Sequence, residues 1–265
     1  MVIIKLTSAR NCFRYLIKVY GIKEIYIPYY ICSCIRHIAF EEGCKINFYH
    51  INLDFTPSGD FPKNAYILYP NYFGVCSKIV ENLAKIYPNL IVDNAHSFYS
   101  KHYGLASFNS LRKFFSKIRD GGFLYTSKKL VLNIDRDDYS YIPKELDYDE
   151  ICTNERRIDN LDMKLISNTT DNLFKNTDLD VEKARRKNAF QRYEKIYGNS
   201  NCLKIDIAPD DVPFCYPYFA KSEDDADKLV NKLKNQSVII YRYWDNLPES
   251  YLENNFYRRL VAIPL

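Results

Sequence analysis

Hydrophobic and polar residues alternate along the chain with two different periods, which predict helices and strands in turn. Apolar residues recur every three or four positions from Phe13 to Tyr20, and this spacing predicts a helix that Gly21 can end. Further helices are predicted over residues 32–43, 76–87, 181–198 and 222–235. Short β-rich runs predict strands over residues 23–30, 45–51, 65–70, 89–93, 122–127 and 237–244.

This order of elements indicates an α/β fold. Several of the predicted strands are apolar on both faces, as parallel strands between two layers of helices are. We therefore predict a three-layer, mainly parallel sheet with helices on both faces, followed by a smaller α+β unit. The expected divisions are a large domain over 1–150, a connector over 151–180 and a small domain over 181–265. The polar stretch over 135–150 predicts an exposed loop.

Composition and charge exclude several classes of protein. With 47% hydrophobic and 26% charged residues, the chain is globular rather than disordered. The net charge of +4 is mild, and the basic run over 183–187 fits a solvated helix face, so we expect no nucleic-acid partner. No apolar run is long enough to cross a bilayer, and the opening MVIIKL is too short for a signal peptide. We expect a cytoplasmic protein.

The eight cysteines are scattered, which indicates reduced thiols rather than a disulfide framework. Cys32 and Cys34, with His37 close behind, form the one group that suggests a metal site. No second pair of cysteines or histidines follows at the spacing of a zinc site, so we expect no metal.

Candidate chemistry begins with Asp93, at the end of the apolar strand over 89–93, with His96 three residues later. Ligands collect beyond the carboxyl ends of strands in such sheets. A carboxylate there is desolvated and requires a cation or several hydrogen-bond donors. The protonated ring nitrogen of a pyridine cofactor is one suitable partner. The alternative is an ordinary aspartate that caps the next turn.

Lys113 is the candidate nucleophile. Its neighbours Phe114 and Phe115 would desolvate it, which lowers the pKa of the amine and favours attack on a carbonyl group. Ser110 precedes it on the same turn, where its hydroxyl could bind a phosphate. The alternatives are a surface lysine whose stem covers the two phenylalanines, and Lys117 as the reactive amine.

The residues Thr7-Ser8-Ala9 stand immediately before the first predicted helix. Free backbone amides and the helix dipole suit a phosphate at such a position, although an ordinary Ser/Thr cap is the alternative. A lysine, a serine and a distant aspartate are the groups that a pyridoxal 5′-phosphate (PLP) site requires.

In this order the motifs resemble the PLP-dependent sugar aminotransferases of the DegT/DnrJ/StrS type, which have the type I fold. The matching segments fall within about residues 5–125 and are Ser8-Ala9-Arg10-Asn11, Pro28-Tyr29-Tyr30, Gly43 to Ile51, Asn71-Tyr72-Phe73-Gly74, Asp93-Asn94-Ala95-His96, and Ser107-Phe108 with Lys113 and Asp120-Gly121-Gly122. Residues 181–265 are similar to the small domain of the family, but less closely.

The resemblance implies three catalytic residues. Lys113 would bind PLP covalently and move protons between the substrate carbon and the cofactor. Asp93 would pair with the pyridinium nitrogen, and His96 would lie near the phenolic oxygen or the ring face.

The resemblance also implies a set of cofactor-binding residues. Ser110 and the backbone of Ala9 and Arg10 would bind the phosphate, although the family usually has Gly and Thr in place of Ala9 and Arg10. Tyr30 would pack on the ring, whereas the stacking aromatic of the family usually falls two residues later, where this chain has Cys32.

The function implied is transfer of an amino group, from glutamate, to a nucleotide-linked keto-sugar in surface polysaccharide or glycan biosynthesis. A homodimer is implied as well. The chain is shorter than usual for the family, and two alternatives stay open. One is another PLP reaction such as sugar dehydration, which Lys113 disfavours because some dehydratases have His at this position. The other is an inactive, shortened homologue that acts as a binding protein.

Overall fold

A seven-stranded sheet is the central element of the protein, whose computed structural model describes residues 1–139, 148–203, 207–245 and 247–265. The strand order is β1-β7-β6-β5-β4-β2-β3. The strands are β1 (Val2–Leu6), β2 (Glu24–Pro28), β3 (Lys45–Tyr49), β4 (Ile67–Pro70), β5 (Leu90–Asn94), β6 (Ala106–Asn109) and β7 (Gly122–Thr126). Strands β2 to β6 run parallel. Strand β7 is antiparallel to both of its neighbours, β6 and β1, so β1 at the edge has the same direction as β2 to β6. The predicted fold class is confirmed.

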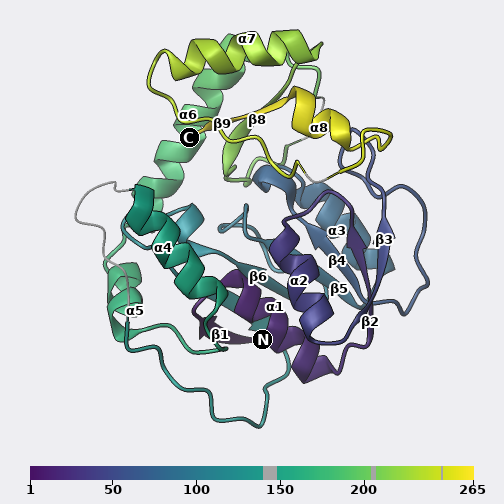
Figure 1. Cartoon of the computed structure of the whole chain (residues 1–265), viewed down its shortest axis with the longest axis vertical. Coiled ribbons are helices and arrows are strands. Elements are labelled where there is room, and N and C mark those ends of the chain that lie inside the picture. Colours follow the sequence, from purple (N-terminus) through teal and green to yellow (C-terminus); the bar gives the residue numbers. More distant parts are fainter. Residues whose placement is uncertain (140–147, 204–206, 246) are drawn as a thin grey trace.

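Helices cover both faces of the sheet, which explains why its central strands are apolar throughout. Leu68 and Ile91 pack against α1 (Ala9–Tyr20) and α2 (Ser33–Glu41), which lie on the near face in Figure 1. Tyr69 and Val92, one residue further along each strand, pack against α3 (Ser77–Ile86) on the other face. Because neighbouring residues of a strand point to opposite faces, both faces of β4 and β5 must be apolar.

Two helices lie in the segment that was predicted to be a connector. The remaining helices are α4 (Tyr148–Asp159), α5 (Asn168–Lys175), α6 (Leu179–Tyr197), α7 (Glu223–Lys234) and α8 (Asn254–Arg259). Polar contacts hold α5 and α4 against the sheet: Lys5 forms an ion pair with Asp171 at 2.6 Å, and Asn154 donates to the carbonyl of Arg119 at 3.0 Å. Residues 140–147 of the predicted loop lie outside the described residues.

The C-terminal unit, from α6 to β9, has a core of its own. Strands β8 (Cys215–Phe219) and β9 (Leu260–Pro264) pair antiparallel, and their residues pack with those of α7. Strand β8 was not among the strands that the sequence predicted. The strand predicted over 237–244 is wrong, because Ser237 and Trp244 have φ values of 60° and 56°, which end an extended strand, and only Tyr241 forms an isolated bridge.

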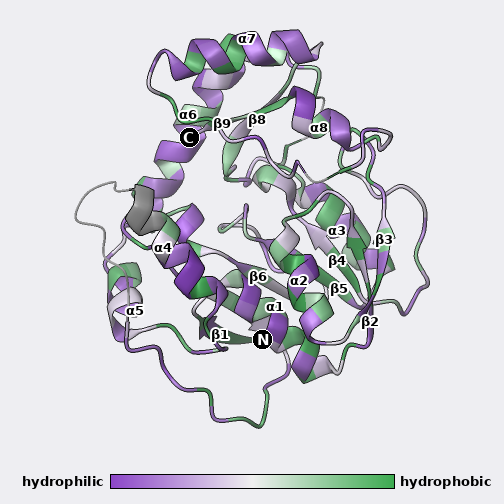
Figure 2. Cartoon of the chain, in the orientation of Figure 1, coloured by the Kyte–Doolittle hydropathy of each residue, from purple (hydrophilic) through white to green (hydrophobic). Residues whose placement is uncertain are grey.

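The division at residues 150 and 180 stays a prediction. Figure 2 shows that α6, the first element of the C-terminal unit, is largely hydrophilic along its length. In the part of the chain that the structure describes, none of the helices combines the length and apolar character needed to cross a membrane.

Gly74 lies where the backbone of the C-terminal unit packs against the loop that follows β4. The backbone amide of Phe214 donates to the carbonyl of Phe73 at 2.8 Å. Gly74 has a φ of 74°, and a Cβ atom there would lie 2.5 Å from the carbonyl oxygen of His96 and 3.2 Å from the amide of Phe214. Only glycine satisfies both the backbone conformation and this close approach.

We therefore expect Gly74→Ala to lower the free energy of unfolding by about 3 kcal/mol or more, since backbone atoms cannot rotate away from the added methyl group. Gly59→Ala is the matched control, because Gly59 also has a positive φ but has no atom within 4 Å of the added position. Its cost is expected to be about 1 kcal/mol. Urea denaturation measures both values, and equal losses would contradict the packing role of Gly74.

Candidate active site

The carboxyl ends of β5 and β6 bring the three predicted catalytic residues to one place. Asp93 is in β5, His96 follows that strand, and Lys113 ends the short 3-10 helix Leu111–Lys113 that follows β6. Because β5 and β6 are parallel neighbours, the loops after them leave the same edge of the sheet. The amine Nζ of Lys113 lies 2.8 Å from Nε2 of His96.

Asp93 is a buried carboxylate beside Lys113. Its side chain is 9% exposed and accepts a hydrogen bond from the backbone amide of Ala95 at 2.8 Å. Burial raises the pKa of Asp93 to about 6, while the Ala95 amide and the charge of Lys113 oppose the rise. Asp93 does cap a turn, as the alternative proposed. Among the described residues, however, no cation pairs with it within 4 Å.

The Lys113 amine lies in an apolar setting. Burial lowers its pKa, and the neighbouring charge of Arg112 lowers it further. Phe114 and Phe115, which the sequence predicted to desolvate this amine, belong to an aromatic cluster against which Phe214 also packs. The ring that faces the amine is Phe214, whose centroid is 5.9 Å from Nζ.

Aromatic rings surround His96. Phe214 stacks on the imidazole with a centroid distance of 4.5 Å and an interplanar angle of 9°, and Trp244 is nearly parallel to it at 5.9 Å. Phe73 and Tyr243 complete the enclosure at 5.6 and 5.3 Å. Burial lowers the pKa of His96, as does the nearby Lys113, so the imidazole is neutral at pH 7. A neutral ring can accept a hydrogen bond from the amine at Nε2.

The end of β6 and the start of α1 form the predicted phosphate site. The Ser110 side chain is buried and has no hydrogen-bond partner among the described residues, whereas Ser107 bonds to Nδ1 of His102 at 2.8 Å. A Cβ atom at Gly122 would lie 2.7 Å from the Asn109 carbonyl and 2.8 Å from the Ala9 amide. Glycine at 122 thus lets the Ser110 turn approach the helix N-terminus.

Two arginine side chains lie at this site and share one carboxylate. Arg10, predicted for its backbone, donates to Oε2 of Glu155 at 3.1 Å and forms an ion pair with Asp159. Arg112 contacts the other oxygen of Glu155 at 3.0 Å. Sequence reasoning missed Arg112 because its partner Glu155 is 43 positions away, in a helix that the sequence did not predict.

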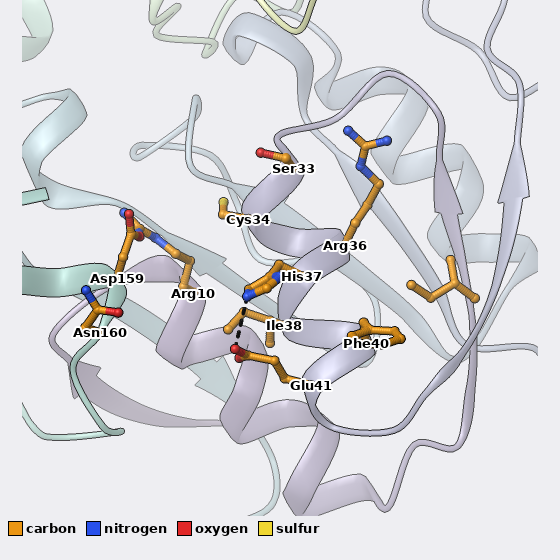
Figure 3. Close-up of a pocket in the computed structure, with 11 residues that line it drawn as sticks. Arg10, Ser33, Cys34, Arg36, His37, Ile38, Phe40, Glu41, Asp159 and Asn160 are labelled. Carbon is orange, nitrogen blue, oxygen red and sulfur yellow. Dashed lines mark ion pairs between the residues drawn. The ribbon is translucent and has the colours of Figure 1, made fainter. Parts of the chain in front are cut away.

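A cavity of about 670 Å³ opens beside this site. Figure 3 shows Arg10 and Asp159 on one wall of it and α2 on the opposite wall. His37 is on that wall and pairs with Glu41 at 3.1 Å. Within the described residues, no group of three or more His, Cys, Asp or Glu side chains is arranged to hold a metal ion.

Tyr30 and Cys32, both predicted to bind the cofactor, differ in burial: Tyr30 is fully buried and Cys32 is partly exposed. The Tyr30 ring has no exposed surface and packs edge-on against Trp244 at 4.7 Å, so its position does not support the predicted contact with a cofactor ring. Cys32 is partly buried, with its sulfur 2.9 Å from that of Cys34. The bond from Cys34 lowers the pKa of Cys32 to about 5, and the charge of Lys113 contributes.

The C-terminal rings at this site were not predicted. Phe214, Tyr243 and Trp244 are about a hundred residues or more beyond Lys113 in the sequence, and no spacing connects them with it. The only feature of the sequence that could have indicated them is the high content of aromatic residues over 214–219 and 241–244.

The structure resembles solved aminotransferases over its whole length. It matches a DegT DnrJ EryC1 StrS aminotransferase from Brucella abortus with a TM-score of 0.64 and 13% identity, covering 100% of this chain and 81% of that one. It matches NtdA from Bacillus subtilis, solved with PMP bound, with a TM-score of 0.65 and 14% identity over 100% and 69%. For PseC from Helicobacter pylori, an aminotransferase of pseudoaminic acid biosynthesis, the values are 0.60 and 14% over 100% and 81%.

No protein-family model matches the sequence, and no curated protein does either. At these identities the comparisons establish the fold, which agrees with the resemblance that the motifs indicated.

The raised pKa of Asp93 has a consequence for stability. The unfolded chain releases this proton near pH 4 and the folded chain near pH 6, so folding is disfavoured as the pH rises through this window. In the cofactor-free protein, Asp93→Asn should therefore gain stability relative to wild type, by up to about 3 kcal/mol above pH 7 and little at pH 4.

Urea denaturation at the two pH values measures this difference. Asp210→Asn is the control, because the Asp210 side chain is 83% exposed. A gain for Asp93→Asn that is the same at both pH values would show that the folded carboxyl titrates normally.

Proposed function

We propose that this protein is a PLP-dependent aminotransferase that delivers an amino group to a keto-sugar. The observation that supports it most is the meeting of Lys113, His96 and Asp93 at the edge of β5 and β6. This meeting occurs in a sheet whose fold is shared with solved aminotransferases, one of them with PMP bound.

The residues present fit the cofactor at both ends. The Lys113 amine has no carboxylate ion pair among the described residues, so it is available to an aldehyde. The Ser110 hydroxyl and the N-terminus of α1 offer donors for a phosphate. Asp93 has a carboxylate that no cation neutralises within the described chain, and a protonated pyridine nitrogen would do so and lower its pKa.

PLP, when bound, supplies a ring that withdraws electrons from the substrate carbon. The side chains supply the rest. Lys113 has a lowered pKa, which increases the fraction of free amine that can take a proton from that carbon and return it. His96, held neutral among its aromatic neighbours, can accept a hydrogen bond from the amine and fix its direction.

The substrate class follows from the resemblance and from the names of similar structures. PseC is named for the biosynthesis of pseudoaminic acid, and Spr1654 from Streptococcus pneumoniae is named as a sugar aminotransferase, which supports a sugar as the amino acceptor here. We propose a nucleotide-linked keto-sugar as acceptor, glutamate as donor, and a cytoplasmic role in surface polysaccharide or glycan biosynthesis.

Borohydride reduction tests the proposed role of Lys113. With PLP added, the wild-type protein is expected to show a visible absorption band, and reduction should fix one cofactor on Lys113. Lys113→Ala should lose the band and transamination activity while remaining folded, since the amine faces the site rather than the core. Lys117→Ala is the matched control, because Lys117 is exposed on the same segment, and it should retain both.

Mass spectrometry locates the reduced adduct. An adduct on Lys117 would refute the assignment of the nucleophile. Wild-type protein that forms no adduct at saturating PLP would refute the enzyme and favour a binding protein with this fold.

We also propose a homodimer with the site near the interface, as the resemblance implies. Phe40, on the α2 wall of the cavity in Figure 3, is 75% exposed and is an apolar surface that a second subunit would cover. Light scattering is expected to give twice the chain mass of 31.3 kDa. A stable monomer that still binds PLP would contradict this proposal.

A further inference from the structure

Arg186 is the only buried residue of α6, which the structure describes in full. Its side chain is 5% exposed, and no carboxylate among the described residues forms an ion pair with it. The neighbouring Arg185 differs, because it is exposed and pairs with Glu182 at 3.0 Å. A buried guanidinium without a counter-ion is costly, so the contacts that it does make must offset that cost.

Those contacts are with the backbone around the reactive amine. Nη2 of Arg186 donates to the carbonyl of Phe114 at 3.0 Å and approaches that of Lys113 at 3.5 Å. Nη1 donates to the carbonyl of Phe214 at 3.1 Å, and the guanidinium lies 4.5 Å from the centre of the Phe114 ring. The planar guanidinium thus connects two chain segments that are about a hundred residues apart.

Both segments determine the surroundings of the Lys113 amine. The carbonyls of Lys113 and Phe114 follow a single 3-10 turn, and within the described residues no backbone amide donates to either of them. Phe214 provides the ring that stacks on His96 and faces Nζ of Lys113. Moving either segment would let water reach the amine.

We propose that Arg186 is a positioning residue, which fixes the Lys113 turn against Phe214 and so limits the access of water to the Lys113 amine. This inference rests on the proposed function, because the position of the amine matters when Lys113 is the nucleophile. The other groups that face Lys113 are Arg112 on its own turn, His96 and Asp93 from β5 and its loop, and Cys32 with Cys34 at the start of α2.

The test measures the reactivity of Lys113 in cofactor-free protein. Trace labelling with acetic anhydride over a range of pH, followed by mass spectrometry, gives the midpoint at which the Lys113 amine becomes reactive. The exposed Lys117 on the same segment is the reference amine. In Arg186→Met, the midpoint for Lys113 is expected to rise by about one pH unit, because the amine becomes hydrated. Arg185→Met should leave it unchanged.

Arg186→Lys separates position from charge. It retains the positive charge, but an ammonium group lacks the planar fork that reaches both carbonyl groups. In Arg186→Lys we expect the midpoint for Lys113 to rise by most of the amount seen in Arg186→Met. If Arg186→Lys has the wild-type midpoint, the effect of Arg186 is that of its charge and the positioning role is refuted.

A lower melting temperature with an unchanged Lys113 midpoint in both variants would make Arg186 merely structural and would also refute the proposal. If Arg186→Met does not fold, Arg186→Lys alone tests the proposal: a raised midpoint for Lys113 supports it, and the wild-type midpoint refutes it. The measurement contains no PLP, so its outcome is separate from that of the borohydride experiment. Wild-type protein without an adduct would remove the proposed function, whereas unchanged midpoints would remove only the role of Arg186.

Discussion

The partial burial of the Lys113 amine constrains the whole candidate site. An ammonium group is costly to bury, and the usual remedy is a carboxylate partner, which would raise the pKa of the amine and suppress its reactivity. Here the contact of Lys113 is a neutral imidazole, His96, and an aromatic face, Phe214. Asp93 is near enough to interact electrostatically but does not pair with the amine. The site therefore contains a carboxyl group, Asp93, whose pKa is raised toward neutral pH, and an amine, Lys113, whose pKa is lowered toward it.

This arrangement requires both parts of the chain. The sheet and the loops after it provide Asp93 and Lys113. The C-terminal unit provides rings around them, of which Phe214 lies with its centroid 5.9 Å from the amine. Gly74 allows the two parts to meet without a steric clash, and Glu253 strengthens the contact, since its fully buried carboxylate accepts the amide of Ile51 at 2.8 Å. A chain that folded only its sheet would expose the amine and return it toward ordinary lysine behaviour.

The sequence predicted the parts whose pattern is local. The apolar period of α1, with Gly21 in the left-handed conformation at its end, and the apolar run of β5 were both visible in it. Helix α5 was missed because the partners of its Phe174, which are Phe115 and Phe123, lie about 50 residues or more earlier in the sequence, so tertiary packing alone brings them together. The strand expected over 237–244 failed because a residue type does not reveal the positive φ of Trp244. Phe214 could not be predicted, since its proximity to His96 is set by tertiary packing alone.

Glu155 affects how any anion reaches the start of α1. Its carboxylate contacts Arg10 and Arg112 with separate oxygens, as a doubly charged ligand would. Because α4 tethers this carboxylate, its effective concentration at the two arginines is set by the chain and is unaffected by dilution. A free phosphate must compete with an intramolecular ligand, which raises its apparent dissociation constant. Binding of an anion to Arg10 and Arg112 therefore requires Glu155 to leave them, so the affinity for the anion and the position of α4 depend on each other.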